Sequence, residues 1–402
     1  MQRILIIGTG FAGMYAALSA ARLRDIQRVA PDALEILVVS PEPNLVIRPR
    51  LYEPAPETMV APLSPLFEAV DVRYRPGRVD AIDTAAREIG FVGRDGSEER
   101  LSYDRLILAA GSRLFMPRIP GLAEHGFNVN GIDEAVALDH HLRALAHRPQ
   151  SPGRDTVVVA GGGFTGIEVA TALPGRLRTI LGDDTRPRVV IVERGPAVAA
   201  DMGAHPRPVI EAALHQAGVE AKVGTGVEIV DASGVTLSDG TRIDSATVVW
   251  AAGMRASPLT AMIPAERDPL GRLLVDRHLR VPGIADVFAT GDTCRAAADD
   301  LGHDSLMSCQ HATRLGAFAG NNAAADLLGV QPEPYHQRAY VACLDLGPYG
   351  AVLTRGWDRV TELTGAEAKA MKTEINTVWI YPPRADRAAA LAAAEPGKVT
   401  DL

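Results

Sequence analysis

The stretch RILIIGTGFAG, residues 3–13, decides the fold of this chain. An apolar run leads into a glycine loop, and an alanine-rich stretch with helical character follows. In such a strand–turn–helix unit, Gly8 makes the tight turn, Gly10 lets the backbone approach a pyrophosphate, and Gly13 lets helix and strand pack closely. The free N–H groups at the start of the helix then face the phosphates. With a second strand over 33–39, the stretch predicts a βαβ unit that binds a nucleotide.

The same device recurs over 156–166, TVVVAGGGFTG, ahead of a helix and a strand that ends at Glu193. The register matches, because Gly8 precedes Ser40 by the same 32 positions that separate Gly161 from Glu193. One GxGxxG loop is weak evidence, since glycine turns also occur for purely structural reasons. Two loops in matched register, each between a strand and a helix, are strong evidence for two homologous nucleotide-binding units.

Three further landmarks follow in order: AAG at 109–111, AAG at 251–253 and ATGD at 289–292. Together with the two glycine loops, they resemble the two-dinucleotide-binding-domain flavoproteins of the pyridine nucleotide-disulfide oxidoreductase superfamily. The resemblance implies an α/β fold with two Rossmann-like domains, the second inserted in the first, and a small C-terminal α+β region. It implies FAD in the first domain, where Asp292 bonds the ribityl chain, and NADH or NADPH in the second.

The resemblance also implies where the domains divide and which residues bind the cofactors. The FAD-binding domain comprises 1–118 and 255–330, the NAD(P)H-binding domain 119–254, and the C-terminal region 331–402. The implied FAD-binding residues are Gly8, Gly10, Phe11, Ala12, Gly13, Ser40, Arg48, Ala109, Gly111, Gly291 and Asp292. The implied NAD(P)H-binding residues are Gly161, Gly163, Phe164, Thr165, Gly166, Glu193, Arg194, Ala252 and Gly253.

The segment SCQHATR, 308–314, indicates which group of these flavoproteins is most similar. It resembles the Ala-Gln-x-Ala-x-Gln motif of type II NADH:quinone oxidoreductases and NADH dehydrogenase-like flavoproteins, in which the glutamines line the quinone pocket. Gln310 fits this motif, whereas Cys309 replaces an alanine and Arg314 the second glutamine. A redox cysteine pair is excluded at 41–52, because that stretch contains no cysteine. The resemblance therefore implies hydride transfer from NADH to FAD, and then two-electron transfer to a quinone-like acceptor.

Two other classes of protein share every nucleotide motif. One is a reductase of a small protein partner, such as a ferredoxin or rubredoxin, which differs only at the acceptor face. The other is a non-catalytic flavin redox sensor, which binds both dinucleotides but turns over slowly.

The nucleotide specificity of the second unit depends on two adjacent residues. Glu193 ends its second strand, where a carboxylate accepts hydrogen bonds from ribose hydroxyls and repels a 2′-phosphate. Glu193 thus favours NADH, whereas Arg194 could accommodate the phosphate of NADPH. In the first unit the equivalent residue is Ser40, whose hydroxyl lacks the paired acceptors of a carboxylate.

Glu168, Arg48 and Gln310 are the candidate catalytic residues. By resemblance, Glu168 lies near the nicotinamide and Gln310 near the quinone; Thr165 and Glu168 also fit a capping box, which would make the carboxylate a helix cap. Arg48, in the sequence IRPR, resembles an arginine that contacts FAD and would stabilise anionic reduced flavin; the alternative is a surface arginine. His311 is either a proton donor to the reduced acceptor or a packed helix residue.

Composition excludes several kinds of partner. The 402 residues carry a formal charge of −8, which disfavours nucleic acid as a partner. The cysteines, histidines and carboxylates form no cluster with metal-ligand spacing, so the sequence predicts no metal site. Three widely spaced cysteines and the absence of a signal peptide favour the cytoplasm. A helix over 364–376 is a candidate for peripheral contact with the inner face of the membrane, although its thin apolar face favours packing on the protein itself. Trp379 and Tyr381 could serve such a contact or a homodimer interface.

Overall fold

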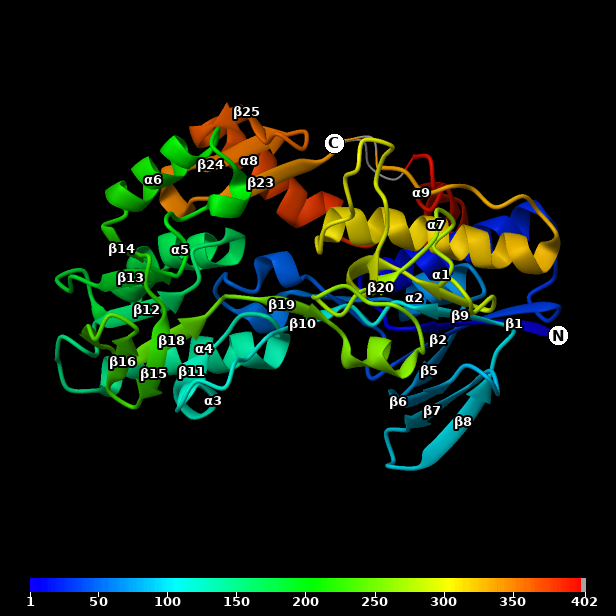
Figure 1. The fold of residues 1–402 in the computed structure, drawn as a ribbon, viewed down its shortest axis with the longest axis horizontal. Coiled ribbons are helices and arrows are strands. Elements are labelled where there is room, and N and C mark those ends of the chain that lie inside the picture. The colour runs from blue at the N-terminus through cyan, green and yellow to red at the C-terminus, as the bar shows by residue number, and fades with distance from the viewer. Residues whose placement is uncertain (338, 399–402) are drawn as a thin grey trace.

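The computed structural model describes residues 1–337 and 339–398. The first glycine loop lies at the end of a five-stranded parallel sheet (Figure 1), with the strand order β21-β9-β1-β2-β5. These strands are β1 Gln2–Ile7, β2 Leu34–Ser40, β5 Arg73–Pro76, β9 Arg105–Leu108 and β21 Val287–Ala289. Strands β1 and β2 are nearly continuous apolar runs, as expected for a parallel sheet that is covered on both faces.

Helix α1 (Phe11–Ile26) packs closely against helix α7 (Cys309–Leu328). The approach depends on glycine, because a Cβ on Gly316 would overlap the carbonyl oxygen of Ala12, and one on Gly320 would overlap that of Ala16. This contact brings the start of α7 beside the first glycine loop, although the two are far apart in sequence.

A second five-stranded parallel sheet has the order β11-β18-β12-β13-β14. Its strands are β11 Gly126–Phe127, β12 Thr156–Ala160, β13 Arg188–Glu193, β14 Val219–Val223 and β18 Thr247–Trp250. All of them lie between β9 and β21 of the first sheet in the chain order. The chain passes from the first sheet to the second through β10 (Ser112–Leu114) and returns through β19 (Met254–Ala256). These two strands pair with each other as antiparallel neighbours.

The predicted α/β fold with two Rossmann-like sheets is therefore confirmed, and Figure 1 shows the sheets at opposite ends of the long axis. The residue numbers at which the domains divide remain predictions.

Among the smaller sheets of the described residues, three are antiparallel and three-stranded, and the last of these lies beside the second Rossmann unit. They are β6–β8 (Arg78–Asp83, Glu88–Val92, Glu98–Ser102), β15–β17 (Val227–Asp231, Gly234–Leu237, Arg242–Asp244) and β23–β25 (Val341–Asp345, Ala351–Arg355, Val360–Thr364). The C-terminal strand β23 packs against helix α5 (Phe164–Leu181) and helix α8 (Gly365–Glu374), as Figure 1 illustrates. The expected helix over 364–376 is thus α8, followed by a π-helical turn at Ile375–Trp379.

The remaining elements are short or connect the sheets. They are α2 Ser64–Ala69, α3 Leu122–His125, α4 Ile132–Ala144, α6 Arg207–Gln216, α9 Arg387–Ala393, β3 Asn44–Val46, β4 Val60–Pro62, β20 Leu273–Leu274 and β22 Cys294–Arg295. Within the described part of the chain, no helix is both long enough and apolar enough to cross a bilayer.

Candidate functional site

The first glycine loop has the shape that a pyrophosphate requires. Gly8 adopts φ +109°, and a Cβ there would lie 2.5 Å from the carbonyl oxygen of Ala109. A Cβ on Gly13 would overlap the Gly8 carbonyl oxygen, whereas one on Gly10 would have nothing within 4 Å. No side chain caps α1, so its first N–H groups remain available to an anion. The backbone at the three glycines is compatible with the separate roles that the sequence predicts, and the binding of a dinucleotide phosphate here remains a prediction.

The ATGD segment lies beside this loop. Gly291 has φ +63°, and a Cβ there would lie 2.7 Å from the Ala12 side chain. The Asp292 carboxylate accepts a hydrogen bond from the Ser112 hydroxyl at 2.5 Å and lies 3.8 Å from the Arg48 guanidinium. Burial raises the pKa of Asp292, and the charge of Arg48 opposes this shift. A buried carboxylate with one hydroxyl donor has acceptor capacity left for a polyol chain.

Arg48 is held in place by hydrogen bonds to Asn130 and Ser112. Its guanidinium donates to the side-chain oxygen of Asn130 at 2.5 Å and to the Asn130 carbonyl oxygen at 3.2 Å. Its third contact is the Ser112 hydroxyl, 3.3 Å away. Arg48 is therefore an oriented cation next to Asp292, which argues against a merely solvated arginine; its contact with FAD remains a prediction.

At the adenosine end of the first loop, Ser40 is buried and already engaged. Its hydroxyl lies 2.6 Å from the carbonyl oxygen of Glu42 and 3.1 Å from the Thr9 hydroxyl. The Glu42 side chain points instead to the exposed Arg94, at 2.5 Å. In this arrangement neither residue supplies the paired acceptors that a ribose diol would need.

The second glycine loop repeats the first. Gly161 has φ +119°, and a Cβ on Gly166 would overlap the Gly161 carbonyl oxygen. The nearest atom to a Cβ on Gly163 is a carboxylate oxygen of Asp201, at 3.7 Å. Helix α5 begins at Phe164, has Gly163 as its N-cap, and carries no side-chain cap. The second loop therefore also presents free helix N–H groups, here with the Asp201 carboxylate near its middle glycine.

The residues that follow β9 and β18 pack against the first glycine of each loop. Ala109 lies against Gly8, and the Ala252 side chain would lie 3.0 Å from a Cβ on Gly161. Gly111 and Gly253 both adopt positive φ, +65° and +82°, in the turns that follow. The AAG segments thus restrict the loops in the same way in both units.

The capping-box interpretation of Glu168 is wrong. Because Gly163 is the N-cap, Thr165 already lies within α5 and Glu168 is too far along the helix to cap it. The Glu168 carboxylate is buried and accepts a hydrogen bond from the Lys372 ammonium at 2.8 Å and from the Asp345 N–H at 3.2 Å.

Lys372 is a site residue that the sequence analysis missed. Its ammonium also donates to the carbonyl oxygen of Cys343 at 3.0 Å, and its side chain is only 6% exposed. Burial acts to lower the pKa of Lys372, but the charge of Glu168 outweighs it and the pKa is raised. Burial raises the pKa of Glu168 in turn, against the pull of Lys372. Nothing in the periodicity of α8 distinguishes the buried Lys372 from the partly exposed Lys369.

A second set of polar groups surrounds this pair. The Asp345 carboxylate accepts from the Tyr52 hydroxyl at 2.8 Å and from the Lys369 ammonium at 2.5 Å. Tyr52 follows the Arg48 segment, and Asp345 ends β23. The network therefore joins the first Rossmann unit, the second Rossmann unit and the C-terminal sheet at one point.

The start of α7 places the motif residues in different environments. The Gln310 side-chain oxygen accepts from the Val341 N–H at 3.2 Å, which joins α7 to β23. Arg314 is buried, and its Nε donates to the carbonyl oxygen of His336 at 2.7 Å. Cys309 begins α7, and burial raises the pKa of its thiol. Arg314 thus binds His336 in the connection between α7 and β23, whereas Gln310 binds the first residue of β23.

His311 is a fully buried aromatic neighbour of Tyr340, with ring centroids 4.9 Å apart. Its Nδ1 lies 3.0 Å from the Ser308 hydroxyl. Burial lowers its pKa to about 3, and Arg359 adds to the effect, so the ring is neutral at physiological pH. These contacts support the packed alternative for His311.

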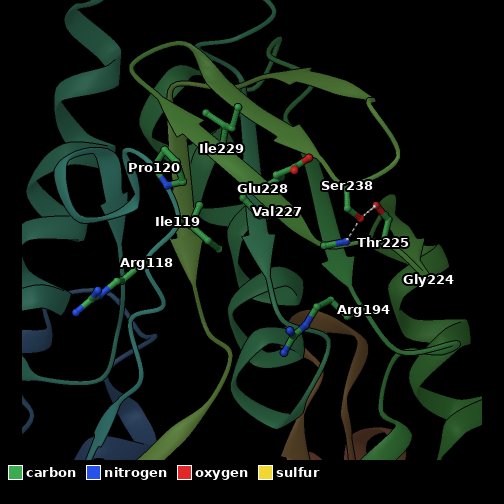
Figure 2. Close-up of a pocket in the computed structure, with 11 residues that line it drawn as sticks. Arg118, Ile119, Pro120, Arg194, Gly224, Thr225, Val227, Glu228, Ile229 and Ser238 are labelled. Atoms are coloured by element: carbon green, nitrogen blue, oxygen red, sulfur yellow. Dashed lines mark hydrogen bonds between the residues drawn. The ribbon is translucent and has the colours of Figure 1, made fainter.

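Glu193 is oriented by the second glycine loop. One carboxylate oxygen accepts from the Gly162 N–H at 2.8 Å and the other from the Gly195 N–H at 2.7 Å. The next residue, Arg194, lines a cavity of about 750 Å³ together with Arg118, Thr225 and Ser238. In Figure 2, Arg118 lies at the left and Arg194 lower and nearer the middle, both below the labelled residues of β15.

Comparisons with known proteins agree with this geometry. The family described as pyridine nucleotide-disulphide oxidoreductase matches residues 2–316. An NADH dehydrogenase-like protein of Mycobacterium tuberculosis is 46% identical over 399 residues, 98% of each chain. A type II NADH:quinone oxidoreductase of the same organism is 31% identical over 370 residues, covering 83% of this chain and 75% of the relative.

A solved structure has the same fold. It is NDH2 from Plasmodium falciparum in complex with NADH, which superposes with a TM-score of 0.79 at 14% identity and covers 97% of each chain.

Proposed function

We propose, from the premise that this chain belongs to the pyridine nucleotide-disulphide oxidoreductase family, that it is an NADH dehydrogenase whose electrons pass through FAD to a quinone-like acceptor. The chain is an enzyme of a family that uses a flavin and a nicotinamide nucleotide, and its relatives include quinone reductases. The acceptor, the nucleotide preference and the individual site residues are the parts that we infer.

The observation that carries the proposal is the pair of uncapped glycine loops, with the ATGD segment beside only one of them. The loop at Gly8 and the buried Asp292 carboxylate fit the pyrophosphate and the polyol chain of FAD. The loop at Gly161 fits a second dinucleotide, with Glu193 at its ribose end. FAD, when bound, supplies the hydride acceptor and the two-electron donor in one ring system.

The chain's own residues would orient the cofactor and hold charge. Arg48, fixed by Asn130, is the cation that we assign to the flavin end of the first site. The ion pair with Glu168 keeps Lys372 protonated. The charge of Lys372 also acts to lower the pKa of Cys309, the first residue of α7, so Lys372 would hold a proton near the start of that helix. Gln310 would face the acceptor; Arg314 would not, because its guanidinium binds His336.

Anaerobic titration of the purified protein tests this proposal. We expect a yellow protein whose flavin absorbance is bleached by NADH and restored by a menaquinone analogue. The matched control is Asp292→Ala, which should be recovered with little flavin and should lose the spectral change. Failure to take up flavin would refute the proposal entirely. In a different outcome, NADH bleaches the flavin and no quinone restores its absorbance, but a reducible iron–sulfur protein restores it rapidly. That result would show that the acceptor is a protein and not a quinone.

Peripheral contact with the inner face of the membrane stays the less favoured prediction, because α8 packs against β23 and β24; the exposed apolar side chain beside it is Val378, at 61%. Sedimentation with anionic vesicles, compared with Val378→Asp, tests this contact. Equal sedimentation of both proteins would refute it. A homodimer through Trp379 and Tyr381 remains a prediction.

A further inference from the structure

A carboxylate lies at the middle glycine of the second loop. One Asp201 carboxylate oxygen lies 3.7 Å from the Cβ position of Gly163, the glycine that has to admit a dinucleotide pyrophosphate. Helix α5 carries no side-chain cap, so this carboxylate lies near the start of the helix without bonding its N–H groups. The first loop differs, because nothing lies within 4 Å of the Cβ position of Gly10. A pyrophosphate that approaches the second loop therefore meets a negative charge beside the donors that would bind it.

The segment that carries Asp201, residues 199–203, is held at both ends. Asp201 belongs to a 3₁₀ turn at Ala200–Met202, which is flanked by Ala199 with φ +55° and Gly203 with φ +80°. The Ala199 N–H donates to the carbonyl oxygen of Gly162 at 2.8 Å, and Ala199 and Met202 are both buried. A left-handed backbone is unfavourable for a residue with a Cβ, so Ala199 is a strained point of this segment. Asp201 itself is exposed, so its side chain can turn away from the loop while the buried neighbours stay packed.

The turn between β24 and β25 contacts the other side of the 199–203 segment. The Cβ position of Gly203 lies 3.8 Å from the Cβ of Arg359. The Arg359 guanidinium lies over the Tyr340 ring, 4.1 Å from its centroid. Its Nη1 is buried and has no hydrogen-bond partner among the described residues. Because a buried donor without an acceptor costs free energy, this guanidinium is suited to one more acceptor.

Asp201 and Arg359 both act on the same phenol ring. The charge of Asp201 raises the pKa of Tyr340, whereas the charge of Arg359 lowers it. In the part of the chain that the structure describes, the two groups nevertheless form no ion pair with each other. A turn of Asp201 away from Gly163 and toward Tyr340 would bring its carboxylate to the unpartnered N–H of Arg359.

From these contacts we propose that Asp201 and Arg359 form a charge gate at the nicotinamide nucleotide site. Asp201 opposes the pyrophosphate in the nucleotide-free protein, and it pairs with Arg359 when the pyrophosphate displaces it from Gly163. Arg359 thus acts through Asp201 and does not itself bind the phosphates. The inference rests on the proposed function, because it concerns how tightly the second glycine loop holds its nucleotide.

Calorimetry with ADP-ribose and the flavin-loaded protein tests the role of Asp201 without any redox step. We expect Asp201→Asn to bind ADP-ribose about three- to tenfold more tightly than the unmodified protein, because a like charge beside the pyrophosphate is removed. The matched control is Asp184→Asn, an exposed carboxylate that follows the other end of α5, and it should leave the Kd unchanged. Equal Kd values for Asp201→Asn and the unmodified protein would overturn the proposal.

Variants of Arg359 test whether it acts through Asp201. Arg359→Gln should weaken the binding of ADP-ribose by about threefold, because the displaced carboxylate loses its partner, whereas Arg359→Lys should retain most of the affinity. When Asp201→Asn is already present, Arg359→Gln should have no further effect. If its full effect persists in that background, Arg359 binds the phosphates directly and the gate is wrong. An unchanged Kd in the single variant Arg359→Gln would also overturn it.

The failure of the gate and that of the proposed function give different results. ADP-ribose has no nicotinamide, so its affinity does not depend on hydride transfer. The expected pattern of affinities, with flavin that NADH does not reduce, would refute the proposed function alone. Flavin that NADH reduces, with equal ADP-ribose affinities in all variants, would refute the gate alone. Absence of ADP-ribose binding in every protein would refute both.

Discussion

Removal of the Lys372 ammonium should strongly destabilise the folded protein. In Lys372→Met, the Glu168 carboxylate loses its 2.8 Å donor and retains only the Asp345 N–H at 3.2 Å. The two side chains are 6% and 4% exposed, so water cannot replace the lost partner without a rearrangement. An unpaired charge at such a position costs about 3–5 kcal/mol of the free energy of unfolding.

Urea denaturation of the flavin-loaded protein, followed by circular dichroism, measures this loss. The double variant Glu168→Gln/Lys372→Met removes both charges and should be more stable than Lys372→Met alone, because no buried charge remains unpaired. The reasoning is refuted if Lys372→Met loses less than about 1 kcal/mol, or if the double variant is the least stable of the three.

The pH dependence of the same variant supplies an independent check. Burial already raises the pKa of Glu168, and Lys372 is the first group that opposes this shift, so its removal should raise the pKa further. An acid with a raised pKa in the folded state penalises folding above its unfolded pKa and ceases to do so once it is protonated. The deficit of Lys372→Met relative to the unmodified protein should therefore be smaller at pH 5 than at pH 8.

Three other perturbations follow from the packing and charges described above. Gly13→Ala places a Cβ against the Gly8 carbonyl oxygen and should yield protein with far less bound flavin, measured as the ratio of absorbance at 450 and 280 nm; a normal ratio would contradict the assigned close packing. Gly320→Val drives a side chain into Ala16 of α1 and should lower the urea midpoint of the flavin-loaded protein by an amount equivalent to about 1–3 kcal/mol, whereas an unchanged midpoint would show that the two helices can separate at no cost. Because burial lowers the pKa of His311 to about 3, the unfolded chain binds one more proton than the folded chain between that value and about pH 6.5. The stability that the neutral ring contributes is complete above pH 6.5 and falls by about 1.4 kcal/mol per pH unit on acidification. In His311→Gln, the slope of the free energy of unfolding against pH should therefore be smaller by the equivalent of one proton. Equal slopes in the two proteins would refute the buried neutral state.

The two nucleotide-binding units were predictable from local sequence. The glycine loops at 8–13 and 161–166 are local devices, because their roles depend on backbone conformation and on the strand and helix that flank them. Their duplication in register indicated two homologous Rossmann units, and the order of the later landmarks indicated the insertion of one in the other. The structure confirms this α/β architecture.

Tertiary structure alone decided which distant side chains meet. Lys372 belongs to a short helix near the C-terminus, and no local pattern predicts its ion pair with Glu168, which forms only when the β23–β25 sheet packs on α5. The same holds for Arg118 and Arg194, which come from different segments and line one cavity. Local sequence fixes backbone conformation within a turn or two, whereas the pairing of charges depends on packing between elements that are far apart along the chain.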